Sequence, residues 1–273
     1  MRTRWTALLT VLMLLSACTG SGPDEPAVTS SPVAEAGWVP PPADAVFDYQ
    51  LGGAYPPAGD VGIVVRDRTA APDPERYSVC YVNAFQTQPG ENDWWAREHD
   101  DLLLKDAKGG YVEDPDWPGE RLLDTRTAGE LADVVGAWFA GCKAKGFRAV
   151  EPDNLDSWTR SGGLLTRADA LAYGKILIDR AHAAGLAIAQ KNTPELSGEA
   201  GFDFAIAEEC AVYDECGDYR DAYGRQVYEI EYTDNGADAY GKACKSYGGE
   251  ISIILRDRDV VPAGKPGYRY EHC

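Results

Sequence analysis

The sequence predicts an α/β protein built as a single-domain (β/α)8 barrel of the TIM type, stabilised by disulfides. Two segments repeat the same order of a helix, a glycine and a short apolar strand, which is half of a parallel-sheet unit. Six further short apolar runs bring the expected strands to eight. Roughly 235 residues follow the N-terminal segments, a length that suits one barrel. A doubly wound open sheet is the alternative architecture.

The first residues indicate export. Arg2 and Arg4 precede an apolar run at 6–15, which is too short for a permanent membrane span and ends in Leu-Ser-Ala before Cys18. This ending resembles a bacterial lipobox, in which the cysteine becomes the lipidated N-terminus. We therefore expect a signal peptide at 1–17 and a cell-surface lipoprotein anchored through Cys18 to the outer face of the bacterial cell membrane. An ordinary signal peptide with an incidental cysteine is the alternative.

Residues 18–37 are rich in Gly, Ser, Pro and Thr and have no apolar period, so they predict a flexible tether before a domain at 38–273. Loss of residues 1–17 removes Arg2 and Arg4 and no acid, which changes the formal charge from −18 to −20. A surface this acidic repels nucleic acid, which we do not expect as a partner, and attracts cationic ones. Acidity that serves only solubility is the simpler explanation of the charge.

The expected strands share short length, apolar character and a polar exit. They are residues 45–49, 61–65, 78–82, 147–151, 186–192, 204–207, 227–230 and 251–255. Such runs without apolar and polar alternation are typical of parallel strands that are covered on both faces. Some of the helices between them are expected to be shortened or replaced.

Two helices are expected with clear ends. Residues 127–145 place apolar side chains at helical spacing and stop at Gly146. Residues 166–184 open with Thr166 and Asp169 in a pattern like a capping box and stop at Gly185. Each glycine leads directly into one of the expected strands.

Six cysteines remain after Cys18, and an even number in an exported chain favours disulfides. Cys210 with Cys216, and Cys244 with Cys273, are the first pairings to test, because of their proximity and the need to fix a chain end. The three histidines are too few for a convincing zinc site, and no metal or other cofactor is expected.

Polar residues follow the expected strands, and in a barrel these strand ends form the active face. Carboxylates and amides dominate there, which is the profile of a sugar-binding site. Glycoside cleavage needs one carboxyl group to protonate the departing oxygen and a second to attack the sugar or activate water. Asp153 after the fourth strand and Glu208 after the sixth are the candidate pair.

Other chemistries fit the residues less well. The chain has no Gly-x-Ser-x-Gly elbow, and no phosphate loop or dinucleotide fingerprint follows the first strand. A carboxylate-only metal site at Glu151, Asp153 and Asp156 is the alternative, because hard cations accept closely spaced oxygen ligands.

Several motifs in order resemble one family. They are "CYVN" at 80–83, "GERLLD" at 119–124, "EPDNLD" at 151–156, "AQKN" at 189–192, "AEEC" at 207–210, "YDEC" at 213–216 and "EIEY" at 229–232. Together they resemble glycoside hydrolase family 114, the endo-α-1,4-polygalactosaminidases. The resemblance implies an α/β-barrel enzyme that cuts α-1,4-linked galactosamine polymers, with catalytic carboxylates at Asp153 and Glu208.

The chain departs from the family pattern in two places. The family has Asn-Glu-Gln-Cys where this chain has Ala207-Glu208-Glu209-Cys210, and the change to Ala207 is expected to remove a contact to the sugar or behind the site. The segment after Tyr81 differs from the family's Gly- and Ser-rich continuation. Substrate preference is therefore less firmly implied than the reaction class.

Roles follow for the remaining polar residues. Asp153 is the expected nucleophile, or the base if the enzyme inverts, and Glu208 is the expected general acid/base. Glu151 is expected to orient Lys191 by an ion pair, and both are assigned to substrate binding. The other expected substrate contacts are Asp48, Tyr81, Asn154, Asp156, Asn192, Glu231 and Tyr232.

Five aromatic residues follow the third and fourth strands and either stack on sugars or pack their loops onto the barrel: Trp94, Trp95, Tyr111, Trp117 and Trp158. The expected partner is a cationic amino-sugar polysaccharide, a galactosamine polymer. Two functions remain open at this point: a membrane-tethered endo-glycosidase, expected to retain configuration, and a non-catalytic carbohydrate-binding lipoprotein of the same fold.

Overall fold

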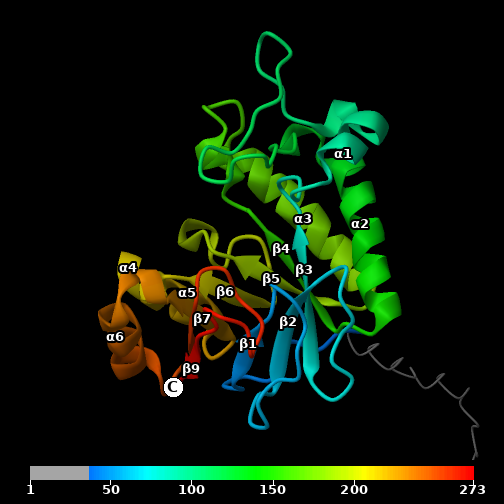
Figure 1. The fold of residues 1–273 in the computed structure, drawn as a ribbon. Coiled ribbons are helices and arrows are strands. Elements are labelled where there is room, and N and C mark those ends of the chain that lie inside the picture. The colour runs from blue at the N-terminus through cyan, green and yellow to red at the C-terminus, as the bar shows by residue number, and fades with distance from the viewer. Residues whose placement is uncertain (1–36) are drawn as a thin grey trace, which may run out of the picture. The chain divides into compact units, whose positions relative to one another are not determined.

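Eight parallel strands in chain order form the framework of the fold (Figure 1). The computed structural model describes residues 37–273. The strands are β1 (Phe47–Tyr49), β2 (Ile63–Asp67), β3 (Tyr77–Asn83), β4 (Ala149–Asp153), β5 (Ala187–Lys191), β6 (Phe204–Glu208), β7 (Val227–Tyr232) and β8 (Ser252–Arg256). Each pairs in parallel with the next. The predicted barrel class and all eight predicted strands are confirmed.

A ninth strand, β9 (Tyr270–His272), was not predicted. It pairs antiparallel with β8, where Ile254 lies opposite His272. Within residues 37–273 no backbone ladder joins β1 to β8. Side chains bridge this seam instead: the Ser252 hydroxyl donates to the Ala45 carbonyl at 3.0 Å, and the Tyr270 hydroxyl donates to the Phe47 carbonyl at 2.9 Å.

Side chains alternate across each strand between the barrel interior and the outer layer. The interior is filled by one set of buried residues, which includes Phe47, Val65, Phe204, Ile230 and Ile254. The alternation fixes which side chain at each strand end can face the barrel mouth.

Two long helices cover the outer face of the central strands. Figure 1 shows α2 (Ala128–Lys145) and α3 (Arg167–Ala183) side by side next to β3 and β4. The capping box of Thr166 and Asp169 is present, and Gly146 ends α2 with φ of 106° in the left-handed region. Both predicted helices are confirmed. The first helix, α1 (Asn92–Glu98), precedes them.

Three shorter helices cover the outer face of β6 to β8. They are α4 (Cys210–Tyr213), α5 (Cys216–Tyr223) and α6 (Ala237–Tyr247). The β1–β2 and β2–β3 connections contain no helix, as the expectation of replaced helices anticipated. Among the described helices, none combines the length and apolar character that crossing a membrane requires.

Three disulfides join the six cysteines of the domain. Cys210 pairs with Cys216 and Cys244 pairs with Cys273, which confirms the two predicted pairings. The third bond joins Cys80 of β3 to Cys142 of α2. The expected signal peptide, Cys18 and the expected tether up to residue 36 lie outside the described residues.

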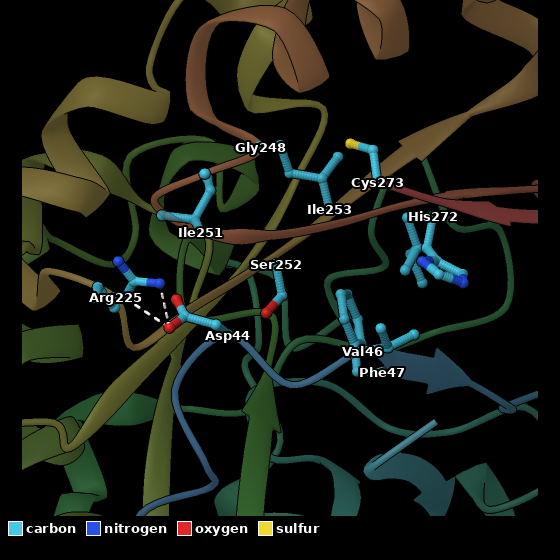
Figure 2. A pocket seen from close by; sticks show the side chains of 12 residues that line it. Asp44, Val46, Phe47, Arg225, Gly248, Ile251, Ser252, Ile253, His272 and Cys273 are labelled. Atoms are coloured by element: carbon cyan, nitrogen blue, oxygen red, sulfur yellow. Dashed lines mark hydrogen bonds and ion pairs between the residues drawn. The ribbon is translucent and has the colours of Figure 1, made fainter. Parts of the chain in front are cut away.

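A small cavity of about 130 Å3 lies where β1 and β8 begin (Figure 2). An ion pair between Arg225 and Asp44 borders it, together with Ser252 and His272. Its place at the amino ends of the strands puts it at the opposite end of the barrel from the strand exits that carry the predicted chemistry.

Candidate active site

The largest concentration of predicted site residues lines one pocket of about 450 Å3 at the carboxyl ends of the strands. Asp153 of β4, Lys191 of β5, Glu208 of β6 and Tyr232 of β7 all face it. These four side chains end neighbouring strands, so the parallel sheet itself brings them together. The position agrees with the active face of (β/α)8 barrels.

The ammonium group of Lys191 lies at the centre of the carboxylates. Its Nζ is 3.2 Å from Asp153 Oδ1, 3.2 Å from Glu208 Oε2 and 3.0 Å from Glu151 Oε1. It also donates to the Tyr49 hydroxyl at 3.0 Å. One buried cation therefore links both predicted catalytic carboxylates.

Burial and neighbouring charges shift the pKa values of this cluster in opposite directions. Burial alone would lower the pKa of Lys191, but the surrounding acids outweigh it and hold the pKa well above its usual range. Burial raises the pKa of Glu151 to about 7, although Lys191 and the Tyr49 hydroxyl oppose it. Glu151 lies beneath the pocket with no exposed surface, so it supports Lys191 and does not itself face the substrate.

Asp153 is held as a carboxylate. The Tyr81 hydroxyl donates to its Oδ2 at 2.7 Å, while Lys191 contacts its Oδ1. Burial favours the neutral acid, but Lys191, the Tyr81 hydroxyl and the backbone N–H of Asn154 outweigh it and lower the pKa of Asp153. An ionised carboxylate at neutral pH is what a nucleophile requires.

Glu208 is fixed by two neighbouring strand ends. The Asn192 amide donates to Glu208 Oε2 at 3.0 Å and accepts from the Glu208 backbone N–H at 2.8 Å. The Tyr232 hydroxyl donates to the other oxygen, Oε1. Both oxygens therefore have defined partners, which holds the carboxyl group in one orientation.

The two carboxylates lie close together. Asp153 Oδ1 and Glu208 Oε2 each lie 3.2 Å from the same nitrogen, so they can be no more than twice that distance apart. Retaining glycosidases place their carboxyl groups about 5–5.5 Å apart, whereas most inverting pairs are wider to admit a water molecule.

Left-handed backbone follows each of the three strands that carry these groups. Asn154 after β4 has φ of 66°, Asn192 after β5 has 50° and Glu209 after β6 has 62°. Asparagine tolerates this region, whereas glutamate adopts it only at some cost. The chain therefore turns away immediately after Asp153, Lys191 and Glu208, and such strain is concentrated at functional sites.

Most of the predicted substrate contacts line the pocket: Tyr81, Asn154, Asp156, Lys191, Asn192 and Tyr232. Asp156 accepts from Arg160 Nη1 at 2.6 Å.

The contacts of Glu151, Asp153 and Asp156 bear on the alternative of a metal site at these three acids. The cation facing Glu151 and Asp153 is Lys191, whereas Asp156 is paired with Arg160. A divalent ion shared by all three acids would need a different arrangement.

The structure corrects the placement of Glu231. Tyr232 points into the barrel, so alternation along β7 turns Glu231 to the outer layer, where it has no exposed surface. Its carboxylate accepts from the Ala211 backbone N–H at 2.9 Å, and Glu229 accepts from that of Cys210 at 2.9 Å. The pair supports the segment that follows Glu208 from behind and does not reach the pocket.

Asp48 is also placed away from the pocket. It lies between the inward-facing Phe47 and Tyr49 of β1 and is 1% exposed. Its carboxylate accepts from the Tyr55 hydroxyl at 2.7 Å and lies 3.2 Å from Arg256 Nη1. Asp48 therefore takes part in a buried ion pair at the β1–β8 seam. It does not line the pocket, where it was predicted to contact the substrate.

Ala207, where the chain departs from the family pattern, also points away from the pocket. Ala207 is buried in the outer layer among Cys210, Cys216 and Ala243. Because Glu208 faces the pocket, its neighbour along the strand faces the helices. The expected loss of a sugar contact at this position is therefore not supported, and the change affects packing behind the site.

Of the five loop aromatics, only Trp117 lines the pocket, and it is 54% exposed. Trp95 is fully buried, and Trp94 and Trp158 pack against the core beside α2 and α3. Tyr111 lies between Arg121 and the hydrogen-bonded Asp100. Four of the five aromatic residues therefore pack within the protein. Trp117 is the one whose position in the pocket allows it to stack on a sugar.

Several pocket residues were given no role from the sequence: Tyr49, Leu51, Glu120, Arg160, Glu209, Arg258, Asp259 and Val260. Tyr49 ends β1, and its inward position follows from the strand-end rule that identified the others. Glu120 belongs to the "GERLLD" motif, which marked its segment without giving its role. The remaining members sit on loops whose paths the sequence pattern does not specify.

A barrel of parallel strands whose carboxyl ends bring two carboxyl groups to one pocket has the arrangement of a glycoside hydrolase. The profile of glycoside-hydrolase family GH114 matches residues 27–273. The chain belongs to this family, so the resemblance expected from the motifs is confirmed and the protein is an enzyme. No protein of curated function matches the chain.

Solved structures share the fold. The structure of Ega3 from Aspergillus fumigatus in complex with galactosamine matches with a TM-score of 0.69 and 23% identity, covering 85% of this chain and 96% of that one. The glycoside hydrolase domain of PelA from Pseudomonas aeruginosa matches with a TM-score of 0.56 and 16% identity, covering 81% and 96%. At these identities the similarity establishes a common fold.

Proposed function

We propose that this glycoside hydrolase is an endo-enzyme that cleaves α-1,4-linked galactosamine polymers with retention of configuration. The observation that carries the proposal is the Lys191 ammonium, which lies 3.2 Å from an oxygen of each catalytic carboxylate. The galactosamine in the Ega3 structure and the family's motif pattern support the substrate class.

The reaction follows from the two carboxyl groups, with Asp153 ionised and Glu208 protonated at the start. Asp153 attacks the anomeric carbon while Glu208 gives a proton to the departing glycosidic oxygen, so the C–O bond breaks and a glycosyl ester forms on Asp153. Glu208, now ionised, takes a proton from water, and the resulting hydroxide attacks the same carbon and releases Asp153. Two inversions restore the α-configuration.

The experiment is reducing-end release from α-1,4-polygalactosamine by the wild type, Asp153→Asn and Glu208→Gln. We expect cleavage by the wild type and a loss of at least about 1,000-fold in each variant. Undiminished cleavage by either variant contradicts its assigned role, and no cleavage by the wild type contradicts the substrate.

The stereochemistry is tested separately by following the first sugar product with NMR. Retention predicts that the α-anomer appears before mutarotation, whereas an initial β-anomer would contradict the role of Asp153 as nucleophile. Asp153→Asn and Glu208→Gln provide the matched blanks for this measurement.

We further propose that the enzyme is exported and anchored to the outer face of the bacterial membrane through a lipid on Cys18. The basis is the Leu-Ser-Ala-Cys sequence at 15–18. Labelling with a fatty-acid analogue is expected to mark the wild type and to fail in Cys18→Ala. Equal labelling of both proteins would contradict the anchor.

A further inference from the structure

Residues 117–120 form a tight turn at the rim of the active-site pocket. The Glu120 backbone N–H donates to the Trp117 carbonyl at 3.0 Å, with Pro118 second and Gly119 third in the turn. Gly119 has φ of 92°, which a type II turn requires at this position. Trp117 and Glu120 both line the pocket.

Hydrogen bonds from neighbouring segments fix the position of this turn. The Asp114 backbone N–H donates to the Glu120 carbonyl at 2.8 Å, and the Asn92 side chain donates to the Gly119 carbonyl at 2.7 Å. Asp114 is itself 1% exposed and accepts from Gln86 and Arg160. The turn is thus a supported part of the pocket wall.

Among the pocket acids of residues 37–273, only Glu120 and the exposed Asp259 form no salt bridge. Asp156 is paired with Arg160, Glu209 with Arg258, and Asp153 and Glu208 with Lys191. The contact of Glu120 in the described chain is a hydrogen bond at 3.0 Å from the Asn83 side chain to its Oε2. Its other oxygen has no partner among residues 37–273.

The environment of Glu120 favours a cation from the substrate. Partial burial raises the pKa of Glu120 to about 7, the Asn83 hydrogen bond and the charge of Arg160 oppose this rise, and Asp153 and Asp114 add to it. A cation in direct contact with the carboxylate would lower the pKa further and favour the ionised form. The exposed acid at Asp259 also lines the pocket, but solvent already stabilises its charge.

We propose that the turn at 117–120 is an amino-sugar subsite, in which Trp117 stacks on the apolar face of a pyranose and Glu120 binds the ammonium group of a non-acetylated galactosamine residue. This inference rests on the proposed function and adds the acetylation state that the site selects. An N-acetyl group removes the positive charge and leaves the carboxylate unpaired, which a partly desolvated site penalises.

The test measures binding separately from cleavage. Asp153→Asn protein is titrated calorimetrically with α-1,4-galactosamine oligomers that are fully deacetylated or fully N-acetylated. The preference is the ratio of the two dissociation constants. Adding Glu120→Gln is expected to reduce the preference for the deacetylated oligomer by about tenfold or more, because one charge-assisted hydrogen bond is lost.

Two further variants separate charge from contact. Glu113→Gln removes the same charge from an exposed position on the same loop, outside the pocket, and is expected to leave the preference unchanged. Trp117→Ala is expected to weaken both oligomers severalfold and to a similar extent, because stacking does not depend on the amino substituent.

Three outcomes would overturn the subsite: an unchanged preference in Glu120→Gln, an equal loss in Glu113→Gln, or an absence of preference for the deacetylated oligomer before Glu120 is changed. The proposed function fails on a different observation, the absence of reducing-end release by the wild type. Because binding is measured with the Asp153→Asn protein, that failure leaves the result for Glu120 interpretable.

Discussion

At the residue scale, Lys191 has the largest influence on the site because one ammonium group faces three carboxylates. Breaking a buried ion pair from one side leaves uncompensated charge, which typically costs about 3–5 kcal/mol. Here the same interaction keeps Asp153 ionised and sets its distance from Glu208. The residue thus connects stability to catalysis.

Replacing Lys191 with Met is expected to shift the pH dependence of activity. Without the ammonium, burial dominates and the pKa of Asp153 rises, so the acidic limb of the kcat/KM profile moves to higher pH. We expect kcat/KM at neutral pH to fall by about 100-fold. Lys265→Met, at an exposed position, is the control, and an unshifted limb in a folded Lys191→Met protein would contradict this role.

Glu229 provides a prediction for stability. Burial, and then the neighbouring Glu231, raise the pKa of Glu229 well above its ordinary value. Above about pH 4.3 the unfolded chain has released a proton that the folded protein keeps, so rising pH lowers the free energy of unfolding by up to about 1.4 kcal/mol per unit.

Glu229→Gln retains an oxygen for the Cys210 N–H and cannot ionise. Its melting temperature relative to wild type is therefore expected to increase between about pH 5 and pH 8. Each kcal/mol corresponds to about 2–4 °C for a domain of this size. Glu113→Gln should show no such trend, and a constant difference for Glu229→Gln would exclude the buried proton.

Sequence reasoning identified residues that end strands and failed where the direction of the side chain mattered. Asp153, Lys191 and Glu208 follow apolar runs, and parallel pairing brings them together. Glu231 and Tyr232 were both assigned to the pocket, although adjacent residues of one strand point to opposite faces. Alternation within β7 could have removed one of them before the structure was known.

At the scale of elements, the strand order and the two long helices were predictable because their signals are local. The apolar runs, the stop at Gly146 and the capping box at Thr166 lie within their own segments. The loop that carries Glu120 was not predictable in the same way. Its position depends on Asn83 and Asn92, and on the contacts of Asp114 with Gln86 and Arg160, which form only when distant segments meet.

Two of the three disulfides are expected to differ in their role, one stabilising the fold and the other supporting catalysis. Cys244 and Cys273 are 29 residues apart and attach the chain end to α6, so replacing both with Ser should cost about 3–4 kcal/mol, or about 10 °C in Tm. Activity well below Tm should change by less than about twofold, because the bond lies away from the pocket.

The bond between Cys210 and Cys216 closes a loop of only 6 residues immediately after Glu208. The double Ser variant is expected to lose less stability and at least about tenfold in kcat, because the segment that positions Glu208 is released. Thermal unfolding and initial rates measured on both double variants show which disulfide affects stability and which affects activity. Loss of activity only in the Cys244 and Cys273 variant would reverse the assignment.

At the scale of the whole molecule, the formal charge of −18 predicts electrostatic attraction of a cationic polymer. Screening shortens this attraction, with a Debye length of about 10 Å at 0.1 M salt and about 3 Å at 1 M. Over this range kcat/KM on polygalactosamine is expected to fall by about threefold or more. A short reduced oligomer is the control, and equal salt dependence for both substrates would contradict long-range attraction.

The left-handed residues after β4, β5 and β6 have a consequence for the evolution of the enzyme. Since the chain leaves the barrel directly after each functional side chain, the loops beyond can lengthen, shorten or change composition without displacing Asp153, Lys191 or Glu208. A relative's loop could therefore be grafted onto this barrel to alter which polymer is accepted, while the chemistry of bond cleavage is inherited intact.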